Sequence, residues 1–92
     1  MARIFLVTSV EDYAKWRAVY DTDIARRDSM GLRQIGVYRE ADHLDEIVIV
    51  FDIDRSAAEA KTLFAERMAD AEFQAIMKKS GVKAPPKAWI LD

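Results

Sequence analysis

The chain has 92 residues, of which 51% are hydrophobic and 33% are charged, and its formal net charge is −2. This balance is typical of a single small globular domain, residues 1–92, and not of a disordered segment. The absence of cysteine excludes disulfides and thiolate chemistry, and the absence of a long Lys/Arg run argues against nucleic acid as a partner.

No stretch approaches the roughly 20 apolar residues that a membrane helix requires. The apolar run at residues 4–7 is too short for the core of a signal peptide, and Glu11 and Asp12 follow at once. We therefore expect no membrane association and a cytoplasmic location. A chain of this length buries only about 60–65% of its unfolded surface, so self-association would add to its stability.

Residues 4–8 form a short apolar run that predicts a first strand. Ser9, with Asp12 three residues later, resembles a capping box and predicts the start of a long helix. Apolar side chains then recur at helical spacing, and Gly31 is suited to end that helix in a left-handed conformation. The apolar stripe consists of Tyr13, Trp16, Tyr20 and Ile24.

Residues 33–40 are rich in β-branched and aromatic side chains and predict a second strand, and the short polar segment 41–45 predicts a hairpin turn. Residues 46–53 predict a third strand. Its apolar residues fall on odd and even positions alike. Because alternate side chains of a strand point to opposite faces, both faces of this strand are apolar.

A second helical region begins with a capping box formed by Ser56 and Glu59. Asp70 divides this region, since it is suited to begin a further short helix that ends at Gly81. Two prolines at positions 85 and 86 then exclude helix and lead into a last strand at residues 88–91.

The resulting order, β-α-β-β-α-β, is the ferredoxin-like arrangement, an α+β fold in which the helices cover one face of a four-stranded antiparallel sheet. Since the third strand is apolar on both sides, we expect a second copy of the protein to cover the other face. Which side of the strand meets the partner stays open, because the register is not known. The two alternatives are Ile47, Ile49, Phe51 and Ile53, or Val48 and Val50.

Over nearly its whole length the chain resembles the dimeric α+β barrel superfamily. The resemblance rests on the element order, on residues 12–16 at the start of the first helix, on the apolar third strand and on residues 73–82 before the last strand. It implies a homodimer whose two sheets join into a barrel, with a ligand cavity between the sheet and the helices of each protomer. The superfamily includes cofactor-independent monooxygenases, haem-degrading enzymes, polyketide cyclases, muconolactone-type isomerases and uncharacterised small proteins.

The best-known enzymes of that superfamily use side chains that this chain does not match. Its monooxygenases and haem-degrading enzymes rely on an asparagine working with a tryptophan and an arginine or histidine, and this chain has no asparagine. Its cyclases use a histidine with a tyrosine, and the one histidine here, His43, falls in the predicted hairpin turn. The resemblance therefore points to the uncharacterised branch of small proteins.

Four aromatic residues are the candidates for ligand binding. Tyr13, Trp16 and Tyr20 share one helical face, where they combine apolar area with two hydroxyls and an indole N–H. Tyr38, close to Gly36 on the second strand, is a candidate for the wall of the same pocket. The alternative is simple packing, with the helix aromatics in the core and Tyr38 against a neighbouring strand.

Three residues are candidates for catalysis. Arg27 and Arg67 fall on otherwise apolar helix faces, where a cation can stabilise a carboxylate or an enolate. Alternatively, their stems cover apolar surface while their heads reach water. His43, as the one histidine of the chain, is a candidate general acid or base, or it is a solvated turn residue.

Metal-ligand spacings and glycine-rich phosphate loops are absent, so the sequence predicts neither a metal nor another cofactor. Three functions stay open. The first is a homodimer that binds a small aromatic or apolar ligand between sheet and helices. The second is a cofactor-independent enzyme (a cyclase, isomerase or oxygenase) acting on an aromatic or enolisable carbonyl compound. The third is a purely structural dimer with no cavity.

Overall fold

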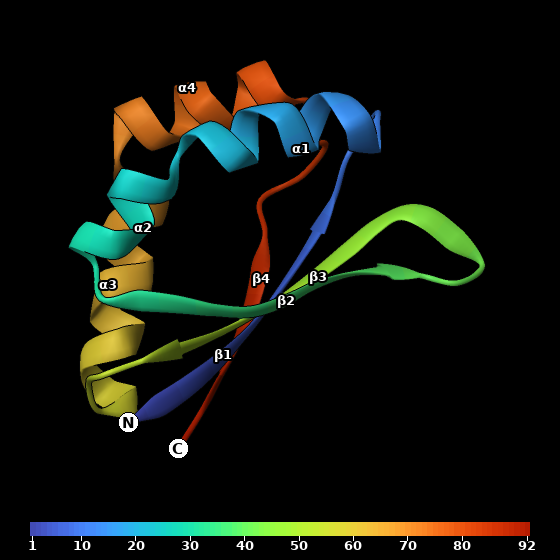
Figure 1. Ribbon diagram of the computed structural model, residues 1–92. Coiled ribbons are helices and arrows are strands. Elements are labelled where there is room, and N and C mark those ends of the chain that lie inside the picture. Colours follow the sequence, from blue (N-terminus) through green and yellow to red (C-terminus); the bar gives the residue numbers. More distant parts are fainter.

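In the computed structural model, residues 1–92 form a four-stranded antiparallel sheet with all helices on one side of it (Figure 1). The strands, in the spatial order β2-β3-β1-β4, are β1 (Ala2–Ser9), β2 (Leu32–Glu40), β3 (His43–Ile53) and β4 (Lys87–Leu91). The helices are α1 (Tyr13–Thr22), α2 (Ile24–Ser29), α3 (Ala57–Ala69) and α4 (Ala71–Ser80). None of them is long and apolar enough to cross a membrane. The architecture is the predicted ferredoxin-like α+β arrangement.

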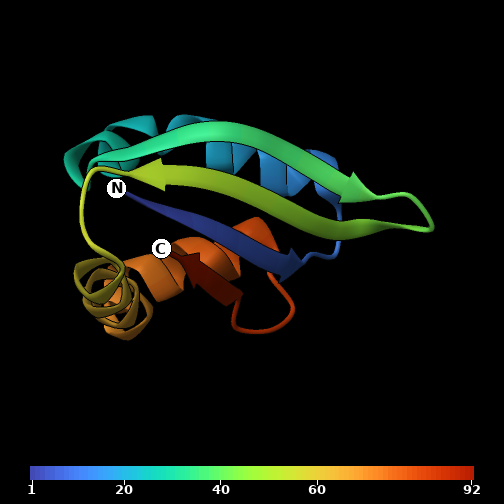
Figure 2. The same ribbon diagram turned by 90° about the horizontal axis from the view of Figure 1, so that it is seen from below.

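The alternation of side chains along β3 gives the sheet two distinct faces. On the helix side lie four β3 residues that are at most 4% exposed, namely Ile47, Ile49, Phe51 and Ile53. Val48 and Val50 therefore face the opposite side, which is the side turned to the viewer in Figure 2. The structure thus decides between the two alternatives that the sequence left open, and the Val48–Val50 side is the one without a covering helix.

The first helix begins at a different residue from the one predicted. Asp12 is the N-cap of α1, and its carboxylate accepts a hydrogen bond from the backbone N–H of Lys15. Ser9 stays in β1, where its hydroxyl donates to Glu46 on β3 at 2.6 Å. The predicted capping box at Ser9 is therefore wrong, because strand pairing continues through Ser9 and holds it away from the helix.

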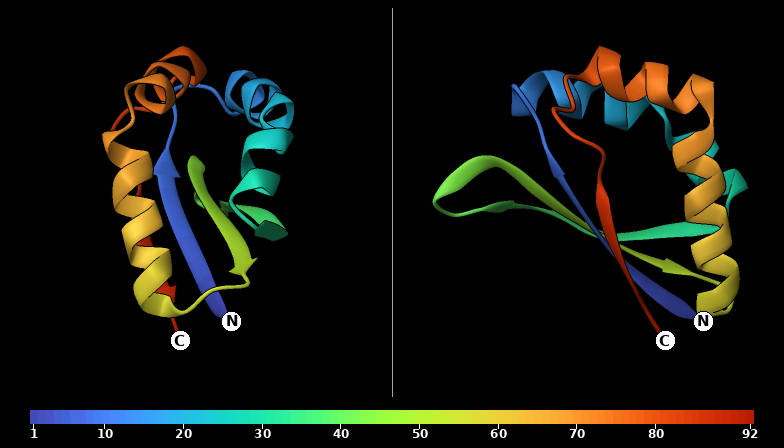
Figure 3. Two further views of the ribbon diagram at one scale, coloured as in Figure 1. Left: turned by 90° about the vertical axis from the view of Figure 1, so that its left-hand side faces the viewer. Right: turned by 180° about the vertical axis from the view of Figure 1, so that it is seen from behind.

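Both helical segments bend at an aspartate, so the single long first helix of the prediction is divided in two. Asp23 ends α1 and begins α2, and Asp70 ends α3 and begins α4. As a result, α1 and α4 lie side by side while α2 and α3 descend toward one end of the sheet (Figure 3). Arg26 on α2 ties the two bends together, lying 3.2 Å from Asp23, 3.7 Å from Asp70 and 2.7 Å from Glu72.

The turn between β2 and β3 is shorter than predicted. Glu40 pairs directly with His43, which leaves only Ala41 and Asp42 in the turn. His43 is therefore the first residue of β3 and not part of a five-residue turn. The hairpin projects well beyond the rest of the sheet (Figures 1 and 2).

Candidate functional site

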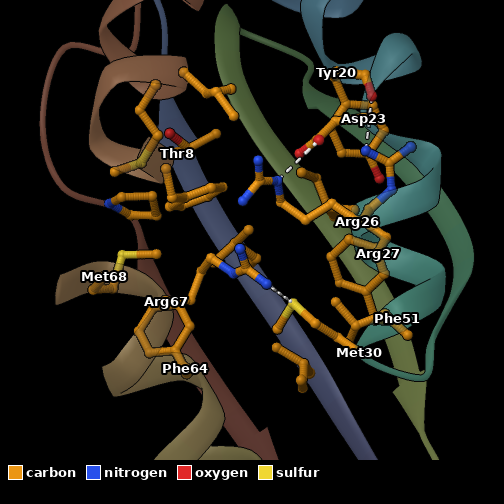
Figure 4. A pocket seen from close by; sticks show the side chains of 18 of the residues that line it. Thr8, Tyr20, Asp23, Arg26, Arg27, Met30, Phe51, Phe64, Arg67 and Met68 are labelled. Carbon is orange, nitrogen blue, oxygen red and sulfur yellow. Dashed lines mark hydrogen bonds and ion pairs between the residues drawn. The ribbon is translucent and has the colours of Figure 1, made fainter. Parts of the chain in front are cut away.

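A cavity of about 130 Å³ lies between the helix side of the sheet and the helices (Figure 4). Its lining residues come from all four helices and from β1, β2 and β3. Most of its lining is hydrophobic, and five aromatic side chains contribute, namely Trp16, Tyr20, Phe51, Phe64 and Phe73. An apolar cavity of roughly 150 Å³ is known to take up benzene, so this one suits a ligand built on a single ring.

Two of the four predicted ligand-binding aromatics, Trp16 and Tyr20, line this cavity. Their rings stack with centroids 4.7 Å apart. The Tyr20 hydroxyl donates to Oε1 of Gln34 at 2.6 Å, and burial raises the pKa of Tyr20, although the charges of Arg27 and Arg17 oppose that shift. A phenol with a raised pKa stays protonated near neutral pH, so Tyr20 can donate a hydrogen bond but is unsuited to act as a base.

The other two predicted aromatics lie outside the cavity lining. The ring of Tyr13 is covered by the Arg39 guanidinium, 4.0 Å from the ring centroid, and its hydroxyl accepts a hydrogen bond from Arg17. Tyr38 pairs with Val48, which puts it on the helix-free side of the sheet, where it is 55% exposed. Alternate residues of β2 point to opposite faces of the sheet, and the sequence did not show which of them face the helices. Tyr38 belongs to the set that faces away from the helices.

Arg27 and Arg67 both line the cavity, from α2 and α3 respectively. The Arg27 guanidinium lies 3.7 Å from the Tyr20 ring centroid and donates to the Tyr20 carbonyl oxygen at 2.7 Å. Arg67 donates to Sδ of Met30, and its closest carboxylate, Asp70, is 3.7 Å away. In Figure 4 the Arg67 side chain reaches across from α3 toward Met30 at the end of α2.

The charged groups of the lining are three arginines and one aspartate, although the chain as a whole has a net charge of −2. Arg26 is neutralised, since it has three carboxylates within 4 Å. Arg27 forms no ion pair, and Arg67 has one carboxylate at 3.7 Å. Positive charge therefore faces an apolar cavity from Arg27, which has no counter-ion, and from Arg67, whose one ion pair is long, and this favours an anionic group there.

Thr8 is a lining residue that the sequence analysis missed. It is 5% exposed, and its hydroxyl has no hydrogen-bond partner. A buried hydroxyl without a partner costs about 1–3 kcal/mol, so such groups are rare in folded proteins. Its position shares the parity of Ile4 and Leu6, but β1 is apolar on both faces and its sequence gives no signal of which side chains point inward.

Asp23, Arg26 and Met30 also line the cavity and were not predicted to do so. The break at Asp23 changes the direction of the chain, so the helical phase counted from Trp16 does not place residues beyond it. No signal in the sequence marked Arg26 as the residue that joins the two helix bends.

His43 lies on the projecting hairpin, away from the cavity lining. Its Nδ1 is 2.8 Å from Oε2 of Glu40, and its side chain is 75% exposed. The hydrogen bond from His43 holds the pKa of the Glu40 carboxyl below its usual value. The structure does not bring His43 together with Arg27 and Arg67. No group of three or more His, Asp or Glu side chains is arranged to hold a metal ion.

No protein-family model and no curated protein matches the chain. Solved structures do match it. The protein Atu4242 from Agrobacterium tumefaciens superposes with a TM-score of 0.70 at 17% identity, over 100% of this chain and 92% of that one. A NIPSNAP domain protein from Burkholderia xenovorans gives a TM-score of 0.64 at 15% identity, over 100% and 93%. A Bordetella bronchiseptica protein, named among the antibiotic biosynthesis monooxygenases, gives 0.72 at 14% identity, over 99% and 94%.

The chain has the ferredoxin-like α+β fold. The resemblance seen in the sequence is confirmed at the level of the fold by these neighbours, which match this chain over almost its full length. At identities of 14–17% the comparison supports the fold alone, and the activity in a neighbour's name is a statement about that neighbour.

Proposed function

We propose that the protein is a cytoplasmic homodimer that binds a small aromatic or apolar ligand between the sheet and the helices of each protomer. The cavity is the observation that carries this proposal. Protein interiors are close-packed and contain few voids larger than a water molecule. This small chain nevertheless keeps about 130 Å³ lined mostly by apolar and aromatic side chains. Ligand sites are typically concave, mostly apolar and supplied with a few polar groups, and the cavity fits that description.

The homodimer part of the proposal is supported by the helix-free face of the sheet. Several large apolar side chains on or beside this face are 44–62% exposed: Ile35, Tyr38, Trp89 and Leu91. The register puts Phe5, Val48 and Val50 on the same face, between β2 and β4. A contiguous apolar area of this kind marks an interface, and a second copy of the same face buries it symmetrically.

The ligand-binding part can be tested by isothermal titration calorimetry with toluene, a neutral compound built on a single ring. Leu63 lines the cavity, so Leu63→Trp should fill part of it and lower toluene affinity by about ten-fold or more. The matched control is Leu44→Trp on the hairpin, where Leu44 is 53% exposed, and it should bind toluene as the wild type does. Absence of toluene binding by the wild type, or an equal loss in both variants, would contradict the proposal and favour the purely structural dimer.

A second candidate is cofactor-independent catalysis on an aromatic or enolisable carbonyl compound. It is favoured by Arg27 and Arg67, because a guanidinium in an apolar cavity stabilises the negative charge of an enolate. Turnover of a bound compound that is lost in Arg27→Gln but retained in His43→Gln would favour this candidate over simple binding.

A further inference from the structure

We propose that the ligand of the cavity is a hydroxylated aromatic carboxylate. Its carboxylate binds the Arg67 guanidinium at the cavity mouth, its ring lies among the aromatic and methionine side chains, and its hydroxyl bonds to Thr8 inside. This inference rests on the proposed ligand-binding function and specifies the chemistry of the ligand.

Arg67 stands at the mouth of the cavity. Together with Met30 and Leu63, it lines both the cavity and an adjoining surface depression that also includes Glu66 and Asp70. The Arg67 side chain is only 17% exposed, so its charge is largely removed from water. An anion bound there would have its tail in the cavity and its charged head at the opening.

The present partners of Arg67 leave its hydrogen-bonding capacity mostly unused. A guanidinium has five N–H donors, and the structure records one hydrogen bond from Arg67, to the thioether sulfur of Met30. A thioether is a poor acceptor, and the Asp70 oxygen at 3.7 Å is beyond hydrogen-bond distance. A ligand carboxylate would accept two parallel charge-assisted N–H bonds and displace the sulfur contact. Arg26 is less suited to this role, because three carboxylates of the chain already surround it.

The interior of the cavity suits an aromatic ring. Its volume, about 130 Å³, is close to that of a cavity that accepts benzene. Three of the four methionines of the chain line it, namely Met30, Met68 and Met77. Thioethers adapt their shape and make favourable contacts with ring edges, so this lining can close around a planar group.

Thr8 supplies an independent observation that points to a polar group on the ring. Thr8 lines the cavity, and its hydroxyl is buried and has no partner within the protein. In Figure 4 Thr8 lies above the Arg67 side chain in the view, and Met30 lies below and to the right of both. A ring hydroxyl would satisfy the Thr8 oxygen, whereas an unsubstituted ring would leave it unpaired.

The test uses isothermal titration calorimetry with 4-hydroxyphenylacetate and its neutral isostere 4-hydroxyphenylacetamide. The wild type should bind the acid about ten-fold or more tightly than the amide, as a charge-assisted pair predicts. Arg67→Gln should remove that preference by weakening acid binding only. Arg55→Gln is the matched control, since it also deletes one positive charge but lies outside the cavity lining, and it should keep the preference. Arg67→Lys retains the charge, so its preference for the acid over the amide should be intermediate between that of the wild type and that of Arg67→Gln. An intermediate preference also shows that substitution at this position does not simply unfold the protein.

Thr8→Val tests the interior contact with a variant of nearly the same shape. The wild type should bind 4-hydroxyphenylacetate more tightly than phenylacetate, and Thr8→Val should bind the two acids equally. Toluene binding together with equal affinity of the wild type for acid and amide would overturn the anion site while leaving the proposed function intact. Lack of binding of toluene and of every one of these compounds would overturn both. A hydroxyl preference that persists in Thr8→Val would overturn the role of Thr8.

Discussion

At the scale of single residues, Asp52 shows how charge is placed at the border of the helix-free face. Its two carboxylate oxygens accept hydrogen bonds from Arg3 at 2.8 Å and from Arg33 at 3.1 Å. The hydrogen bond from Arg3, and then that from Arg33, holds the pKa of Asp52 below its usual value against the opposing effect of desolvation. β1 and β2 are thereby cross-linked over β3 by one side chain.

This arrangement predicts a defined acid sensitivity. Because the folded-state pKa of Asp52 is lower than that of the unfolded chain, its ion pairs stabilise the fold above the ordinary carboxyl pKa. That contribution is lost as the pH falls through the folded-state pKa. We expect the urea midpoint of the wild type to drop in this acidic range, and Asp52→Asn to be less stable near neutral pH with a flatter profile. Parallel pH profiles for the two proteins would contradict the prediction.

The sequence placed some of the site residues and not others, and the difference follows from periodicity. Trp16 and Tyr20 could be grouped because helical spacing is regular within α1. Arg27 also lines the cavity, although the bend at Asp23 lies between it and those two residues. Tyr38 could not be placed, since β2 has polar and apolar residues on both faces and its sequence does not show which face meets the helices. Thr8 was missed because a lone threonine in an apolar strand is ordinary, and only the cavity beside it makes its free hydroxyl unusual.

At the scale of elements, the start of α3 has the most complete cap in the chain. The Ser56 hydroxyl accepts from the backbone N–H of Glu59, and the Glu59 carboxylate reaches back to the backbone N–H of Ser56. We expect Ser56→Ala to lower the free energy of unfolding by about 1 kcal/mol, the usual cost of losing an N-cap. Urea denaturation followed by circular dichroism would measure it. Thr62→Ala, an exposed change in the middle of α3, is the control and should cost far less.

The elements themselves were predicted well where a local signal exists. The capping box at Ser56, the helix start at Asp70 and the left-handed Gly81 (φ 82°) are all present. Local rules failed at Ser9 because a long-range strand pair outcompeted the cap. They also failed at Asp23, where α1 ends and α2 begins, and where Arg26 of α2 forms an ion pair with Glu72 of α4.

At the scale of the whole molecule, the two faces of β3 predict opposite responses to the same substitution. Val48→Glu puts a charge on the helix-free face, so it should give a folded monomer. Ile49→Glu puts the same charge into the core, where Ile49 is 2% exposed, so it should unfold the protein. Sedimentation velocity and circular dichroism distinguish these results. A Val48→Glu protein that sediments as the wild type does, or a wild type that is itself monomeric, would contradict the homodimer proposal.

An apolar sheet face without a covering helix could be predicted from the sequence, whereas the size and lining of the cavity could not. An apolar strand with too few helices to cover it is visible in the order of residues. The cavity depends on how far two bent helical segments stand from the sheet, and no local pattern encodes that distance. The fold was therefore accessible from the sequence, and the position of the site within it only in part.

The contacts that join the two helix bends have a consequence for the rate at which a ligand would enter and leave the cavity. Two side-chain hydrogen bonds join these helices. Arg26 on α2 donates to Glu72 on α4, and Arg67 on α3 donates to Met30, the residue that ends α2. Ion pairs near the surface weaken as ionic strength rises, whereas moderate salt changes apolar burial little. Added sodium chloride should therefore raise the rate of ligand exchange while changing the free energy of unfolding little. Opening of the cavity mouth would then depend on ionic strength more strongly than the stability of the core does.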